Sequence, residues 1–318
     1  MLGQGPAVAA DDADTAGPPA TPEAARRRIA RVYDRETARA GGTWSSMISV
    51  TDGTAVSAGA DTVVEAYSVN KIAVATAVLD KVDRGLLTLD QRVEVPASIV
   101  IQDTDGVFAL DRAYPSSVTL GHVMSLLLTV SDNTCVRLCG LVCPALELNE
   151  ILRAKGFVQT QVVPVANPNR FFLGRTTPNE THTLLRMLVG GTLLSPASTD
   201  YLLNVLRSLS AFTDGVRLEL TSAERLRVAT KAGWFADGRN EAGVIFDAAG
   251  APVVTYAMFA AGTFSGDPAV NADNYSATHP ALRARAKLGR TMMDAVARLS
   301  TPAARTFGAK AYRPVNGG

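Results

Sequence analysis

The sequence has few residues of the kinds that build metal sites, disulfide frameworks or charged binding surfaces. Of its 318 residues, only three are cysteine and three are histidine. Lys and Arg together number 31 and Asp and Glu number 30, which gives a formal net charge of +1. This balance supplies no long-range attraction to nucleic acid or to an anionic membrane, so neither is expected as a partner. A small molecule or a peptide is the expected partner.

Long apolar runs are also missing. No stretch reaches the roughly 18 apolar residues that a membrane-spanning helix needs, although 47% of the residues are hydrophobic and suffice for a large core. Residues 1–20 contain neither the basic start nor the apolar centre of a secretion signal. We therefore expect a disordered leader and a cytoplasmic globular protein.

The three cysteines are spaced four residues apart, at Cys135, Cys139 and Cys143. On a helix this spacing places them along one face. Because no histidine or carboxylate stands beside them, the pattern fits no common metal site, and a buried stripe of small residues is predicted instead. No metal, cofactor or disulfide is expected.

Hydrophobic periodicity indicates a sheet built from both ends of the chain. A helix over 21–40 and a hairpin over 44–58 come first, and strand character returns over 226–260 before a last helix. The predicted fold is α/β plus an all-α lobe, with an antiparallel sheet flanked by N- and C-terminal helices. The predicted boundaries are a leader over 1–20, an α/β domain over 21–66 and 223–305, an inserted all-α domain over 67–222 and a C-terminal tail over 306–318.

Ser68 and Lys71 form the first candidate pair for chemistry. Ser68 follows an extended segment and opens an apolar helix, where the positive end of the helix dipole favours a developing alkoxide. Lys71 lies one turn later on the same face, within predicted reach of the hydroxyl. If the cleft between the lobes desolvates this ammonium, the neutral amine can accept the serine proton. The pair is a nucleophile with its own base.

Two further short motifs are predicted to face the same cleft. Ser131, Asp132 and Asn133 connect two helical patterns. The Ser131 hydroxyl can relay a proton and the Asn133 amide can hold a substrate amide, whereas Asp132 is expected to brace the turn. Lys231 and Gly233 end a strand, where a cation stabilises negative charge and a glycine permits close approach of the backbone.

Ser-x-x-Lys, Ser-Asp-Asn and Lys-Ala-Gly, in this order, resemble the marks of the class A β-lactamase and penicillin-binding-protein superfamily. The resemblance covers about residues 22–300, and Leu127–Thr134 and Arg239–Gly243 are similar to the family as well. It implies that Ser68 is the nucleophile, Lys71 the general base, Ser131 the proton shuttle, Asn133 a substrate ligand and Lys231 the cation on the facing strand. It also implies an oxyanion hole made by the backbone N–H groups of Ser68 and Trp234.

The chain departs from the family in the loop that activates water. Class A β-lactamases carry a glutamate there, but no Asp or Glu occurs between Glu150 and Glu180. Glu180 is predicted to be a charge at a helix start. The third motif has alanine in place of threonine and is followed by the bulky Trp234. Both changes make an ordinary penicillin a poor fit.

These departures favour a transacylase. The acyl-enzyme on Ser68 would form from an ester or amide and be released by an amine, because a bound amine needs less activation than water. This chemistry resembles that of β-lactamase-like transacylases in nucleoside-antibiotic assembly. The first alternative is a serine hydrolase, acting as an esterase, an amidase or a weak β-lactamase. The second is an inactive binding protein. The acyl donor and the acceptor are not identified.

Other residues keep two interpretations each. The three histidines are widely spaced, which disfavours a Ser-His-Asp triad. Arg170 and Arg175, in the loop without a glutamate, either bind an anionic substrate or are solvated. Trp234 either stacks on an aromatic part of a substrate or only lines the cleft.

Overall fold

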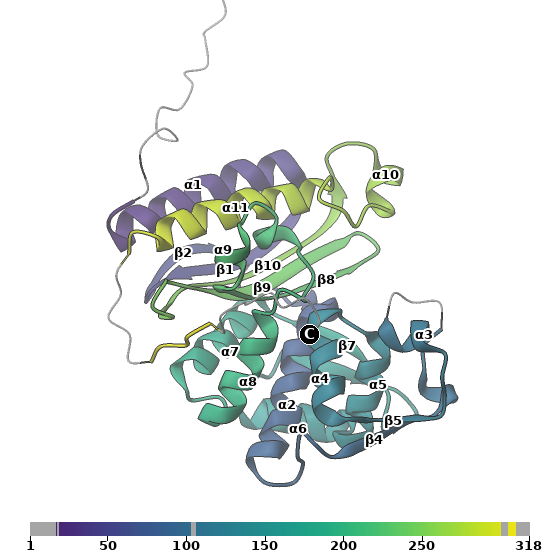
Figure 1. Cartoon of the computed structure of the whole chain (residues 1–318). Coiled ribbons are helices and arrows are strands. Elements are labelled where there is room, and N and C mark those ends of the chain that lie inside the picture. The colour runs from purple at the N-terminus through teal and green to yellow at the C-terminus, as the bar shows by residue number, and fades with distance from the viewer. Residues whose placement is uncertain (1–16, 18, 103–105, 300–304, 310–318) are drawn as a thin grey trace, which may run out of the picture.

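A five-stranded antiparallel sheet joins the two ends of the chain (Figure 1). The computed structural model describes residues 17, 19–102, 106–299 and 305–309. The strand order is β2-β1-β10-β9-β8, so the N-terminal hairpin pairs directly with β10. The strands are β1 (Gly41–Val50), β2 (Gly53–Ala58), β8 (Val228–Phe235), β9 (Gly238–Phe246) and β10 (Pro252–Phe264).

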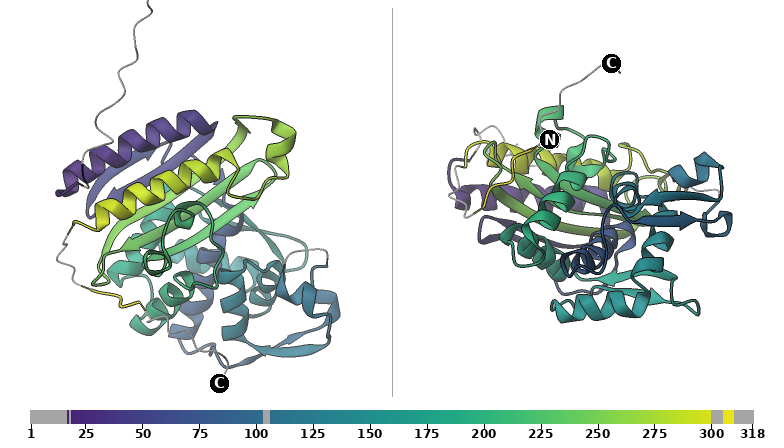
Figure 2. Two further views of the ribbon diagram at one scale, coloured as in Figure 1. Left: turned by 45° about the horizontal axis from the view of Figure 1, so that its top comes forward. Right: turned by 60° about the horizontal axis from the view of Figure 1, so that its bottom comes forward.

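Two helices cover one face of this sheet. α1 (Pro22–Ala40) and α11 (Pro280–Val296) lie side by side, in purple and yellow-green in Figures 1 and 2. α1 begins where the Thr21 hydroxyl accepts a hydrogen bond from the Ala24 amide and ends at Gly41, whose φ is 70°. Side chains such as Ile29, Val254 and Leu288 fill the core between helices and sheet.

The opposite face of the sheet belongs to the core of the helical lobe. Ala242, Val244, Ala257 and Phe259 from the sheet pack there with the apolar sides of the helices. The main helices of this lobe are α2 (Lys71–Asp83), α4 (Leu120–Thr129), α5 (Asn133–Val142), α6 (Ala145–Ala154), α7 (Pro178–Gly190) and α8 (Pro196–Leu206). Shorter helices are η2 (Tyr67–Asn70), η3 (Ala97–Ile99), α3 (Val107–Asp111), η4 (Gly215–Arg217), α9 (Ser222–Arg225) and α10 (Pro268–Ala272). No helix in the described part is long and apolar enough to span a membrane.

The predicted fold class is confirmed, but the inserted lobe is not purely helical. It contains the strand pair β4 (Arg92–Val95) and β5 (Ser116–Thr119). A second small sheet joins β6 (Gln161–Pro164) and β7 (Phe171–Thr176) to β3 (Val64–Glu65). These strands are two to six residues long, so they show too few alternations for a period of two, and β3 pairs with the distant β7.

The C-terminal segment contacts both lobes. Within the predicted tail, Phe307 is buried against Phe246 of β9, and its amide donates to the Gly250 carbonyl at 2.8 Å. The Arg207 guanidinium, just after α8, donates to the Phe307 carbonyl at 2.7 Å. The segment therefore joins the helical lobe to the sheet. The predicted leader up to residue 16, residue 18, and the tail from residue 310 lie outside the described residues.

Candidate active site

Ser68 lies in η2, the single turn of 3₁₀ helix that leads into α2. The preceding Tyr67 has a φ of 49°, an unusual backbone conformation for a residue with a side chain. The buried Asn70 amide donates to the carbonyls of Leu173 and Arg175, at 2.7 and 3.0 Å, and so ties the turn to β7. Ser68 itself is only half-buried. The turn is thus anchored to β7 through Asn70, while Ser68 faces the cleft.

Lys71 is fully buried beneath the cleft. Its ammonium donates to the carbonyl and the hydroxyl of Ser131, at 2.5 and 2.9 Å, and to Asn133 Oδ1 at 2.7 Å. These contacts hold Nζ against the second motif.

Ser131 lies between two lysines. Lys231 Nζ, like that of Lys71, donates to Ser131 Oγ, at 3.0 Å, and also to the Ala232 carbonyl at 2.6 Å. Because Oγ accepts from both ammonium groups, its own proton is available for donation to a ligand. Asp132 braces this turn: its carboxylate accepts from the amides of Thr134 and Phe108, at 2.8 and 3.0 Å.

Gly233 allows β8 to approach the serine turn. A Cβ atom at this position would lie 2.7 Å from the backbone nitrogens of Ser68 and Val69, closer than side chains tolerate. Glycine therefore lets the two backbones meet, which the predicted oxyanion hole between Ser68 and Trp234 requires.

Two cavities meet at this point, and Ser68, Asn133 and Trp234 line both. The smaller has a volume of about 70 Å³ and is also lined by Ser131 and Lys231. The larger has a volume of about 650 Å³ and extends along β7. The structure thus brings all seven predicted site residues together: five line the cavities, and Lys71 and Gly233 adjoin those five. The catalytic roles given to them stay predictions.

The other residues singled out in the sequence differ in whether they reach the two cavities. Arg170 lines the larger cavity, whereas Arg175 lines neither. The Trp234 ring lies 4.3 Å from that of Tyr275, centroid to centroid, so a neighbouring aromatic residue already contacts it. His182 is hydrogen-bonded to Ser49 at 2.8 Å and lies outside both cavities.

Glu180 has a structural part in the loop that lacks other carboxylates. It lies in the first turn of α7, behind the Thr177 cap. Its carboxylate accepts hydrogen bonds from the backbone N–H groups of residues 158–160 and from the Thr160 hydroxyl, over 2.6–3.0 Å. Glu180 lines neither cavity. It holds the loop rather than facing Ser68.

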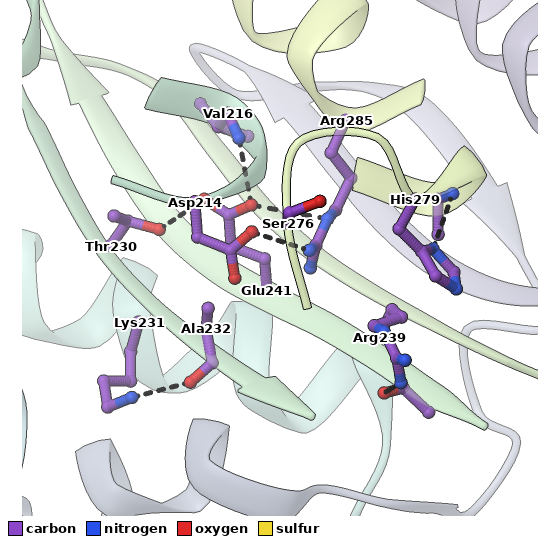
Figure 3. A network of polar contacts seen from close by, with 12 residues as sticks. Asp214, Val216, Thr230, Lys231, Ala232, Arg239, Glu241, Ser276, His279 and Arg285 are labelled. Atoms are coloured by element: carbon purple, nitrogen blue, oxygen red, sulfur yellow. Dashed lines mark hydrogen bonds and ion pairs between the residues drawn. The ribbon is translucent and has the colours of Figure 1, made fainter. Parts of the chain in front are cut away.

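A buried charged network behind β8 was not predicted from the sequence (Figure 3). Arg285 of α11 makes ion pairs with Asp214 and Glu241, at 3.2 and 3.5 Å, and both carboxylates line the smaller cavity. Glu241 also accepts from the Val216 amide and the Thr230 hydroxyl. Burial raises the pKa of Glu241, and the Arg285 charge opposes this shift. The sequence gives one sign of this network, namely that Glu241 precedes the apolar residues of a predicted strand.

The three cysteines are buried in the core of the helical lobe and are free thiols. Burial raises the pKa of Cys139 and of Cys143 to about 12, so both stay protonated at neutral pH. Within the described ranges, no three His, Cys, Asp or Glu side chains gather in a way that could hold a metal ion.

Fold and site together define a β-lactamase-like serine enzyme, with its serine between a sheet lobe and a helical lobe. Residues 24–296 match the family described as the Beta-lactamase enzyme family, and the chain belongs to it. No curated protein matches the chain.

Solved structures with the same fold include β-lactamases and a penicillin-binding protein. A β-lactamase from Xanthomonas campestris is 22% identical, with a TM-score of 0.70 over 84% of this chain and 98% of that one. A class A β-lactamase representative from Bacteroides cellulosilyticus is 21% identical, with a TM-score of 0.69 over 85% and 98%. PBP-A is 21% identical, with a TM-score of 0.67 over 86% and 98%. These structures support the fold, and the family implies serine acyl-transfer or hydrolysis chemistry.

Proposed function

We propose that the protein is a serine transacylase, which moves an acyl group from an ester or amide to an amine. The reacting form has Lys71 as the neutral amine, with one proton fewer than the ammonium described above: Ser68 Oγ attacks the donor carbonyl and gives its proton to this amine. The leaving alcohol or amine departs with a proton relayed through Ser131, and an ester remains on Ser68. The acceptor amine then attacks this ester, and its proton returns to Ser68 as the amide leaves.

The observation that carries this proposal is the loop between residues 157 and 178. It borders the cavity beside Ser68 without a carboxylate, and the following Glu180 is held by four groups of its own loop. The larger cavity, at about 650 Å³, has the size of a small-molecule site. An amine bound there needs less activation than water to attack the ester.

A hydrolase is the second candidate, because Glu65 of β3 lines the same cavity as Ser68. An exposed carboxylate there could activate water in place of the missing loop glutamate. The similar solved structures named as β-lactamases give this alternative further support.

Intact-mass spectrometry with p-nitrophenyl hexanoate separates the candidates. The wild type should gain one hexanoyl group that persists in buffer and is discharged as an amide by benzylamine, and Ser68→Ala should gain none. The matched variant Glu65→Gln should leave the lifetime of the adduct in buffer unchanged. A short-lived wild-type adduct that Glu65→Gln prolongs would establish hydrolysis instead. No adduct on the wild type would favour a binding protein.

The proposal includes a cytoplasmic place of action in the assembly of an amide-containing antibiotic. The three free thiols support a reducing compartment. Fractionation of the producing cells should recover the protein with cytoplasmic markers, and recovery outside the cytoplasm would contradict this part.

A further inference from the structure

The larger cavity combines an apolar wall with two guanidinium groups. Its apolar side chains include Val136, Val165, Phe171, Phe172 and Leu173. Arg137 and Arg170 also line it, and among the described residues Glu65 is the one acidic side chain that does. Two bases against one acid give the described part of the lining an excess of positive charge. A wholly apolar ligand would make no ion pair or charge-assisted hydrogen bond with these guanidinium groups.

Arg137 is held by α5. It follows Asn133 by four residues, so both side chains project from one face of the helix. Its Nη1 donates to the Ile99 carbonyl at 3.0 Å, which fixes the half-buried guanidinium at the cavity. Further donors of its planar fork can still bind a ligand.

Arg170 lines the same cavity and directly precedes β7. No acidic side chain of the described residues lies within ion-pair distance of Arg137 or Arg170. Burial, and then the nearby charge of Arg170, lower the pKa of Arg137, so the two cations are close enough to repel. An oxyanion bound between them would relieve this repulsion and accept charge-assisted hydrogen bonds.

We propose that Arg137 and Arg170 bind a carboxylate at the far end of the acyl donor, whose apolar chain lies in the larger cavity. The inference rests on the proposed acyl-enzyme at Ser68. Four residues of helix separate Arg137 from Asn133, a rise of about 6 Å. Asn133 is placed to hold the group next to the carbonyl that Ser68 attacks. A donor carboxylate bound by Arg137 is therefore expected about one helical turn from that carbonyl. The half-ester of a medium-length dicarboxylic acid fits this spacing.

Two esters that differ in this one group test the proposal. Mono-p-nitrophenyl adipate carries the carboxylate, and p-nitrophenyl hexanoate has the same chain length without it. The wild type should be acylated at least about tenfold faster by the adipate ester, as expected for one strong charge-assisted contact. Arg137→Met, Arg170→Met and the double variant should bring the ratio of the two rates toward one. Arg175→Met removes an exposed arginine outside the cavity and should keep the wild-type ratio.

The outcomes separate this inference from the proposed function. Equal acylation by both esters in the wild type would overturn the anion site and leave the acyl-enzyme intact. If neither ester labels Ser68, the acyl-enzyme fails, and calorimetric titration with monomethyl adipate decides the anion site. Binding by the wild type that the double variant loses supports the site. No binding by the wild type, or equal binding by both proteins, overturns it.

Discussion

Among single residues, His279 shows how burial couples charge to stability. Its Nδ1 accepts a hydrogen bond from the Ala281 amide at 3.1 Å and so caps α11, and its ring packs edge-on against Phe264. Burial, with the charges of Arg239 and Arg285, lowers the pKa of His279 to about 4 (Figure 3). A protonated Nδ1 could no longer accept the capping hydrogen bond. The native state therefore requires the neutral ring.

The pKa of this histidine makes stability depend on acidity. Between pH 6.5 and pH 4 the unfolded chain binds a proton that the folded protein refuses, so the free energy of unfolding falls as the pH is lowered. His279→Asn keeps a capping oxygen but does not titrate. We expect it to be less stable than the wild type at pH 7 and to lose on the order of 2 kcal/mol less stability between pH 7 and pH 4.5.

Urea unfolding at the two pH values measures this difference. The exposed His122 provides the control, because His122→Asn should show the wild-type loss of stability on acidification. His182, whose pKa is also lowered to about 4 by burial, remains in every variant and accounts for part of the common loss. A His279→Asn profile parallel to that of the wild type would contradict the assignment.

At the scale of elements, the sequence was sufficient wherever a segment was long and periodic. The predicted helix over 21–40, the hairpin over 44–58 and the last helix after the closing strands all appear, as α1, β1–β2 and α11. The two-residue β3 was not predicted, because it is held by its pairing with β7 across the fold rather than by a local pattern. The ion pairs of Glu241 and Asp214 could not be predicted either, because tertiary packing alone brings their common partner Arg285 to them.

The close contact between β8 and η2 depends on Gly233, and one added methyl group should disrupt it. Gly233→Ala places its Cβ 2.7 Å from two backbone nitrogens of the serine turn, so strand and turn must separate. We expect a loss of about 1–3 kcal/mol in stability. Displacement of the predicted oxyanion hole should lower the rate of Ser68 acylation by about 100-fold or more.

Gly190→Ala is the matched control for this change. Gly190 ends α7 on the exposed surface with no atom within 4 Å of the added Cβ. The Gly190→Ala variant should retain wild-type acylation of Ser68 by p-nitrophenyl hexanoate. Its free energy of unfolding should be unchanged or raised by up to about 1 kcal/mol. Unfolding curves and acylation rates for both variants decide the point. Wild-type acylation in Gly233→Ala would show that the close approach is not needed.

For the whole molecule, the central fact is that one sheet separates two apolar cores. α1 and α11 close the first core, and the helical lobe closes the second against the opposite face. The site lies where β8, the last strand of the sheet, meets η2 and the start of α5. Because the serine turn and the facing lysine belong to different lobes, the geometry of the site depends on how firmly the lobes are held together.

The C-terminal segment is one of the links that hold them. Phe307 is buried in the second core against Phe246, while Arg207 of the helical lobe donates to its carbonyl and lies over the Phe246 ring at 4.9 Å. Phe307→Ala should lower the free energy of unfolding by about 3 kcal/mol, because it empties a packed site between sheet and helices. Thr306→Ala, at the exposed neighbouring position, should change it by less than about 0.5 kcal/mol. Urea unfolding followed separately by circular dichroism and by tryptophan fluorescence would show whether the lobes still unfold together in Phe307→Ala. A stability equal to that of Thr306→Ala would mean that the segment lies on the surface without fastening the two cores.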